Sequence, residues 1–287
     1  MTRGHYISDF TFNGKKLSDF ECICCNFDSS SGTVEVSSGA DVTLNQEKSS
    51  GSNQFNLYST SYDEPFTLPL SICLNPCANY ENMDISVEQA RKIQKWLSLR
   101  NKKFKLDVIG FEDIYWIGTF TCKQVMLNSS IIGFNLTFTA NTPYALQEDK
   151  SFNIELSDTL ESDIVFTSDI CGYIDADYII TVKETGDLRF DTYYYNPDTK
   201  AYTLDREFTV KNCIADEKIY VKGDTQLVTS SKTAHELGKD CNFILPRIVN
   251  TYQSDDEEVR NKIKSNLKCN VQITYNPTAM IGYGYKS

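Results

Sequence analysis

Three cysteines within four positions, Cys22, Cys24 and Cys25, form the densest group of reactive side chains in the sequence. Thiolates bind zinc or form disulfides, so a metal site, a disulfide cluster and an ordinary buried strand are the alternatives. A zinc half-site separates its two cysteines by two to four residues, and Cys-Ile-Cys-Cys lacks that spacing. In a strand, Cys22 and Cys24 share one face and Cys25 lies on the other. The favoured interpretation is a strand with small apolar side chains facing the core.

A second pair, Cys73 and Cys77, has a spacing that suits a metal half-site. Pro76 and the neighbouring asparagines of "SICLNPCANY" instead indicate a loop that leaves a strand, and no second correctly spaced pair accompanies it. The first sixteen residues, "MTRGHYISDFTFNGKK", have no apolar run typical of a secretory signal. We therefore expect ten reduced cysteines, no metal and no cofactor.

Groups suited to acid–base or nucleophilic catalysis are few. The two histidines, His5 and His235, lie far from any Gly-x-Ser-x-Gly or similar nucleophile motif. The acidic run at 255–258 offers the paired carboxylates of a glycosidase, but a solvated loop or the start of a helix is the simpler interpretation. The sequence therefore predicts no catalytic residue and no enzyme.

Three consecutive tyrosines, Tyr193, Tyr194 and Tyr195, are the best candidates for a binding surface. Exposed tyrosine stacks on sugars and anchors protein interfaces. Alternation in a strand places Tyr194 opposite the other two, so at least one side faces the core. Tyr193 and Tyr195 are predicted as a contact surface, with simple packing as an equal alternative.

The charge balance limits the binding partners. The net charge is −11, from 39 acidic and 28 basic residues, whereas a nucleic-acid surface needs clustered lysine and arginine. The basic stretch 100–105 follows a predicted helix and suits its C-terminal end. No apolar run approaches the ~18 residues of a transmembrane helix, so we expect no membrane insertion.

Alternating strands bounded by Gly, Pro, Ser and Asn predict a mainly β protein with one α-helix at about 86–100. Ser86 followed by Gln89 is a capping-box pattern. Helical spacing produces one apolar stripe. Its members are Val87, Ala90, Ile93, Trp96 and Leu97.

The chain is long enough for two hydrophobic cores. The charged segment "QEDKS", at 147–151, follows the turn at Pro143 and separates two strand-rich blocks. We predict domains at 1–147 and 148–287, the second a β-sandwich of many short strands. The predicted strands of this second block include 243–250 and 268–277.

The segment "FTFNGKKLSDFECICCNF" at 10–27, the single helix, and the block from "IYWIGTF" to "IIGFNLTFTANTPYAL" at 114–146 occur in this order. This arrangement resembles the distal tail proteins of long-tailed, non-contractile bacteriophages. The resemblance covers about 7–147 and weakens afterwards. Phe-Asn-Gly is a common turn, so the order of the motifs carries the resemblance.

The resemblance implies a β-sandwich-like N-terminal domain that assembles as a homo-hexameric ring, and a galectin-like C-terminal β-sandwich. Such a ring lies in the virion, between the tail tube and the tail tip or baseplate, after assembly in the host cytoplasm. Its expected neighbours are the tail tube protein, the tape-measure protein, the tail-associated lysin or hub protein, and receptor-binding proteins. DNA passes through without specific binding, and no catalytic residue is implied. The alternative is a carbohydrate-binding host-adhesion module using Tyr193 or Tyr195.

Overall fold

The structure is a computed structural model that describes residues 7, 9–27, 42–51, 55–62, 64–79, 83–107, 113–168, 172–197, 199–250 and 258–279. The backbone alone is described at 42 and 57–62. Packing divides the chain into two compact units, unit 1 (1–146 and 280–287) and unit 2 (147–279). Antiparallel sheets make up most of the described chain, and one helix is longer than a single turn, which confirms the mainly β prediction.

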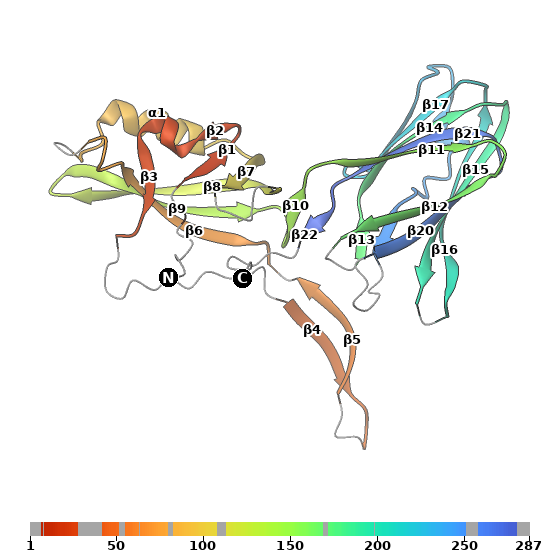
Figure 1. Ribbon diagram of the computed structural model, residues 1–287, viewed down its shortest axis with the longest axis horizontal. Helices are drawn as coiled ribbons and strands as arrows, with labels where there is room; N and C mark the ends of the chain where they lie inside the picture. The colour runs from red at the N-terminus through yellow and green to blue at the C-terminus, as the bar shows by residue number, and fades with distance from the viewer. Residues whose placement is uncertain are drawn as a thin grey trace. The chain divides into compact units, whose positions relative to one another are not determined.

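Unit 1 contains a twisted sheet with helix α1 over one face (Figure 1). Two of its connections are two-residue hairpin turns in which both central residues have positive φ, as the twist of the strands favours. Asn13 and Gly14 (φ 49° and 74°) form the first, and Asn128 and Ser129 (φ 47° and 73°) form the second. The predicted Phe-Asn-Gly turn is confirmed. The order in the sheet is β2 (Lys15–Lys16), β1 (Phe10–Phe12), β7 (Lys102–Leu106), β8 (Ile114–Leu127), β9 (Ser130–Ala140), β6 (Thr67–Leu74) and β3 (Cys22–Cys25).

Helix α1 spans Val87–Leu97 and confirms the predicted helix, although it ends earlier than expected. The Ser86 side chain accepts a hydrogen bond from the Gln89 backbone N–H at 3.2 Å, as an N-cap does. The Gln89 side chain donates to the Phe20 carbonyl at 3.2 Å and so ties the helix to the 3₁₀ turn η1 (Leu17–Phe20). Val87 was predicted in the apolar stripe, but this prediction is wrong, since the side chain is 62% exposed in the first turn of the helix. The remaining members, Ala90, Ile93, Trp96 and Leu97, are buried.

Aromatic side chains dominate the core of unit 1. The Trp96 ring stacks on Phe10 at 5.7 Å between ring centroids, and its Nε1–H donates to the Phe12 carbonyl at 2.9 Å. Phe104 stacks on Phe138 at 4.3 Å. Such pairs stabilise by about 0.5–1.5 kcal/mol each beyond the area they bury.

A separate two-stranded sheet in unit 1 consists of β4 (Val42–Lys48) and β5 (Phe55–Tyr62). Alternating apolar and polar residues at 32–46 predict a strand there, which appears from Val42 onward, and its first part lies outside the described residues. Two short strands, β10 (Ala145–Gln147) and β22 (Thr278–Ala279), lie near the division between the units.

Unit 2 is a β-sandwich of two sheets (Figure 1). Alternating side chains of both sheets form one hydrophobic core, which includes Tyr178, Phe190 and Phe208. The first sheet has the order β11 (Lys150–Leu156), β21 (Cys269–Tyr275), β14 (Ala176–Val182), β17 (Lys218–Lys222) and β18 (Leu227–Ser230). The second sheet has the order β12 (Glu161–Thr167), β20 (Glu258–Ser265), β15 (Gly186–Asn196) and β16 (Ala201–Cys213). A small pair, β13 (Gly172–Ile174) with β19 (Ile248–Asn250), and the four-residue helix α2 (Leu237–Asp240) complete it.

Two predictions about unit 2 are wrong in part. The predicted strand at 243–250 is limited to Ile248–Asn250, since Phe243 has φ 54° and Pro246 has no N–H to donate to a ladder. The acidic run at 255–258 was predicted as a loop or the start of a helix. Its last residue, Glu258, is instead the first residue of strand β20 and pairs with Thr167. Residues 255–257 lie outside the described residues. The β20 pattern was hidden because buried Asn261 and Ser265 replace apolar residues on its inner face.

Candidate functional site

The cysteine trio lies on strand β3, as predicted, with Cys22 and Cys24 facing inward at 1% and 4% exposure. Burial raises the pKa of both thiols to about 12, with smaller contributions from neighbouring groups. Both thiols are therefore protonated at neutral pH and are poor nucleophiles and ligands. Where side chains are described, no group of three or more His, Cys, Asp or Glu is placed to hold a metal ion.

The two predicted cysteine groups meet through Cys25 and Cys73. Cys73 lies opposite Ile23 in the β3–β6 pairing, on the outer face, where Cys25 also points. Burial, followed by a hydrogen bond with Cys73, raises the pKa of Cys25. Cys77 is exposed in the turn after β6. This geometry places Cys22 and Cys24 among the packing residues.

His235 is buried in unit 2, with only 5% of its side chain exposed. Its Nδ1 lies 2.6 Å from Oε1 of Glu217, and that carboxylate also accepts hydrogen bonds from the Ser230 hydroxyl and the Ile214 N–H. Burial works against the charge of His235, but the hydrogen bond and charge of Glu217 outweigh it and raise the pKa above its usual 6.5. The other ring nitrogen, Nε2, lies 3.4 Å from the Asp240 carboxylate, and these contacts hold the loop that carries His235 against β17 and β18. His5 lies outside the described residues.

The predicted tyrosines lie on β15, in the second sheet of the sandwich, and all three are half-buried. The Tyr193 hydroxyl donates to Asp191 at 3.4 Å, and the Tyr195 ring packs against Tyr202 at 5.6 Å between centroids. We call this outer surface the tyrosine face. Its members are Tyr193, Tyr195, Tyr202, Arg189, Asp191, Glu207 and Lys262.

Side chains of the tyrosine face bond mainly to one another. Arg189 contacts Asp191 at 3.0 Å and Glu207 at 2.8 Å. Lys262 lies over the Tyr202 ring at 4.6 Å. These contacts hold the side chains of the tyrosine face in place, and the contact surface at Tyr193 and Tyr195 stays a prediction.

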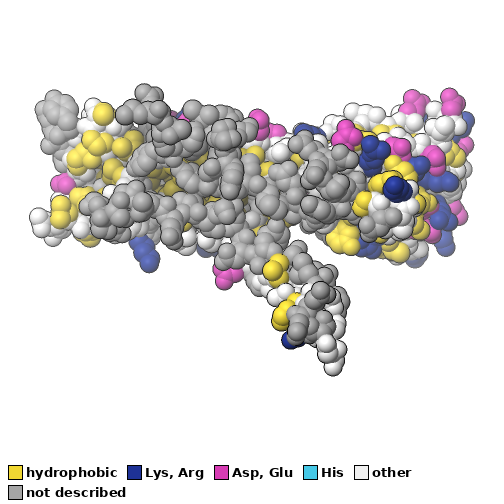
Figure 2. Space-filling model, turned by 60° about the horizontal axis from the view of Figure 1, so that its bottom comes forward, with side chains coloured by type: hydrophobic (Ala, Val, Ile, Leu, Met, Phe, Trp, Pro, Cys, Tyr) yellow, Lys and Arg dark blue, Asp and Glu magenta, His cyan; other side chains and the backbone are white. Residues whose placement is uncertain are grey.

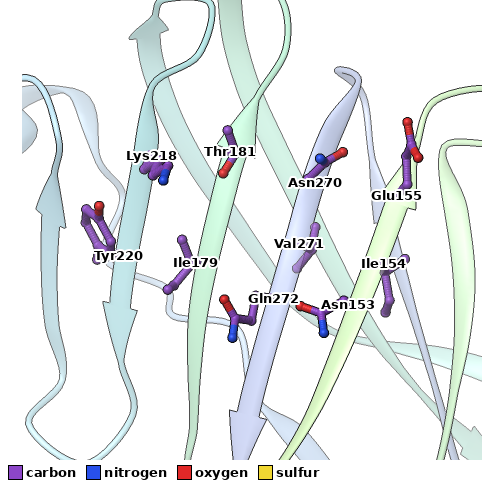
Figure 3. Close-up of a pocket in the computed structure, with 10 residues that line it drawn as sticks. All are labelled: Asn153, Ile154, Glu155, Ile179, Thr181, Lys218, Tyr220, Asn270, Val271 and Gln272. Carbon is purple, nitrogen blue, oxygen red and sulfur yellow. The ribbon is translucent and has the colours of Figure 1, made fainter.

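The opposite sheet of unit 2 carries an open hollow of about 500 Å³ on its outer surface. Figure 3 shows the lining side chains along strands β11, β21, β14 and β17. Strand register arranges them in two rows. We call this surface the amide face: one row is Asn153, Gln272, Ile179 and Tyr220, and the other is Glu155, Asn270, Thr181 and Lys218.

Sequence reasoning missed the amide face. The only signal in the sequence was asparagine within strand patterns, where this residue is disfavoured.

Figure 2 shows acidic and basic side chains of unit 2 interspersed on the side turned to the viewer. None of the helices in the described parts of the chain is long and apolar enough to cross a membrane.

Two family models match nearly the whole sequence. Residues 5–142 match a phage tail protein N-terminal domain, and residues 144–275 match a phage tail C-terminal domain. The chain belongs to this family of phage tail proteins.

Two solved structures of phage proteins match along nearly the whole chain. The Dit protein of phage SPP1 is 9% identical, with a TM-score of 0.57 over 96% of this chain and 100% of that chain. A chain of the phage P2 baseplate in its activated conformation is also 9% identical, with a TM-score of 0.44 over 96% of this chain and 100% of that one. The predicted resemblance to distal tail proteins is thus confirmed in fold. No curated protein matches the sequence.

Proposed function

We propose that this chain is the distal tail protein of a long-tailed, non-contractile phage, and that six copies form a ring joining the tail tube to the tail tip. The observation that carries the proposal is the likeness of fold to SPP1 Dit along the full length of both chains. That protein is described as a paradigm of the hub adsorption apparatus in phages that infect Gram-positive bacteria. Membership of the phage tail family supports the same role.

The β4–β5 hairpin supports self-association of unit 1. A two-stranded sheet is marginally stable alone in water. Two apolar side chains of this hairpin are largely in solvent, Leu44 at 53% and Phe55 at 60% exposure. A neighbouring copy that covers them stabilises the hairpin, and a head-to-tail contact of this kind either closes into a ring or grows into a filament.

The charge of the chain fits a conduit for DNA. A net charge of −11 per copy repels a polyanion, so DNA moves through without the counterion release that drives binding. The proposed neighbours are the tail tube, tape-measure, lysin or hub, and receptor-binding proteins, and the proposed location is the virion. The proposed role is structural.

Electron micrographs and light scattering of the purified full chain test the ring. We expect six-fold rings for the natural sequence and monomers for the variant Leu44→Asp/Phe55→Ser, because both changes replace an exposed apolar side chain of the hairpin with a polar one. Leu227→Asp is a matched control, since Leu227 is 54% exposed on β18 in unit 2 and rings should persist. Monomers of the natural chain, or rings that tolerate the hairpin variant, would contradict this assembly.

A further inference from the structure

Asparagine side chains in unit 2 divide into two groups. Most hold the fold together, as when Asn261 bonds both the N–H and the carbonyl of Val249, and Asn266 bonds the backbone of Arg189 and Asp187. Asn196, Asn212, Asn242, Asn250 and Asn276 also use their side chains internally. Among the hydrogen bonds of the described chain, none uses the side chains of Asn153, Asn270 or Gln272. These three amides lie together on the amide face.

The position of these amides carries an energetic cost. Asparagine is depleted in strands, where β-branched and aromatic residues fit better, and the host-protein scale spans about 1 kcal/mol. Asn153 and Asn270 nevertheless lie within β11 and β21, on the solvent side of a well-formed sheet. Water satisfies these exposed amides in the free chain, and a ligand that displaces this water can use the three amides together.

We propose that the amide face binds a neutral saccharide. Each sugar hydroxyl both donates and accepts, and each side-chain amide offers two donors and a carbonyl acceptor. The half-buried Tyr220 ring, next to Ile179, offers an apolar surface for the C–H side of a sugar ring. A row across four strands is about 14 Å long at ~4.8 Å per strand, which suits a short stretch of oligosaccharide.

The charges of the amide face favour a neutral ligand over an anionic one. Lys218 is its single cation, and Glu155 is at the opposite end of the same row. An extended anion bound at Lys218 would be repelled by the Glu155 carboxylate in the same row. Phosphate sites instead combine several cationic or N–H donors. The tyrosine face is less suited, because Asp191 and Arg189 already bond to each other and to neighbours. This inference goes beyond the proposed function and does not depend on the ring.

Binding of the full chain to an array of neutral and anionic oligosaccharides tests the proposal. We expect at least one neutral member, built from hexoses or N-acetylhexosamines, to bind. Asn270→Ala/Gln272→Ala should weaken that binding about tenfold or more, because it removes two hydrogen-bonding groups. Tyr220→Ala should weaken it similarly. All substituted amides are exposed, so unfolding curves should stay close to those of the natural chain.

Two controls place the site on one sheet. Lys264→Ala changes an exposed residue of β20 in the other sheet, and Tyr195→Ala changes the tyrosine face, so both should bind as the natural chain does. The proposal is overturned if no neutral member binds, if only anionic members bind, or if Tyr195→Ala abolishes binding while the double variant retains it. Ring formation is read separately by electron microscopy, so a failed ring and a failed saccharide site are distinguishable.

Discussion

The two outer faces of the unit 2 sandwich cover one core but differ in the hydrogen bonding of their polar side chains. On the tyrosine face, Arg189, Asp191 and Tyr193 bond to one another. On the amide face, the side chains of Asn153 and Asn270 project from adjacent strands and enter none of the described internal hydrogen bonds. Mutual bonding fixes side chains and satisfies their donors and acceptors, whereas unbonded amides remain available to a ligand. Partnering, rather than the residue type alone, separates a stabilising surface from a candidate binding surface.

The largest effect should come from the core that both faces share. Phe190 is fully buried and its ring meets Tyr178 edge-on at 6.1 Å between centroids. Phe190→Ala should reduce the free energy of unfolding of unit 2 by about 3–5 kcal/mol through lost burial and a cavity. Hydrogen exchange should increase in strands of both sheets. Leu204→Ala, at a residue that is 46% exposed, is the control and should change little. Faster exchange confined to one sheet would show that the faces do not depend on a common core.

A second substitution should affect first the sheet that carries the amide face. Glu217 is fully buried, directly before Lys218, and its carboxylate holds Ser230 and His235. Glu217→Leu should cost about 3–5 kcal/mol, because it leaves the histidine and its neighbours without their acceptor. Exchange in β17 and β18 should accelerate before exchange in β15. Glu236→Leu, at an exposed carboxylate in the same loop, is the control, and an equally large loss there would contradict the assignment.

The Glu217–His235 pair should make the stability of unit 2 depend on pH. Burial raises the pKa of Glu217, but the hydrogen bonds from Ser230 and His235 lower it by more, so the pKa of Glu217 lies below its usual value of 4.5. Its contribution is therefore present above pH 4.5 and is lost as pH falls through the lowered pKa. The pKa of His235 is raised above 6.5, so its contribution is complete below pH 6.5 and is lost as pH rises through the folded value. The stability difference between the natural chain and His235→Gln should be largest between pH 4.5 and 6.5. A pH-independent difference in urea unfolding would show that the imidazolium form plays no part.

Sequence patterns predicted the elements better than the sites. Alternation identified β3 and the inward direction of Cys22 and Cys24, and capping identified the start of α1, since both signals are local. The exposure of Val87 was not predicted, because helical spacing shows which residues share a face but not which of them are covered. The Glu217–His235 pair joins positions 18 residues apart and depends on a loop path that no period encodes.

The amide face escaped prediction for a related reason. Its members come from four strands that are spread from β11 to β21 in the sequence and become neighbours only through strand register. Tyr193 and Tyr195 were predicted as a contact surface because they belong to a run of three consecutive tyrosines. Adjacency along one strand says little about which polar groups the neighbouring strands supply.

A moderate effect should follow from opening the network of the tyrosine face. The Asp191 carboxylate is 7% exposed and accepts from Arg189, whose side chain is 49% exposed. Asp191→Asn should lower the free energy of unfolding by about 1 kcal/mol, since it weakens hydrogen bonds to a charged partner that is largely in solvent. The loss should shrink in high salt because screening already weakens the ion pair. Glu258→Gln, in an exposed pair with Arg260 at 3.7 Å, should have no measurable effect, and a loss as large as that of Asp191→Asn would undo the distinction between them.

The smallest effect should have the opposite sign. Asn270→Thr places a β-branched side chain on a solvent-facing position of β21, where threonine is favoured in strands over asparagine. Because the Asn270 side chain makes no internal hydrogen bond among the described residues, its replacement removes none, and the free energy of unfolding should rise by about 0.5 kcal/mol. Saccharide binding should weaken in the same variant. Asn261→Thr is the matched control, since Asn261 is buried and bonds Val249 on both sides, and its substitution should destabilise. A loss of stability in Asn270→Thr would mean that the amide supports the sheet, and the contrast between the two faces would then disappear.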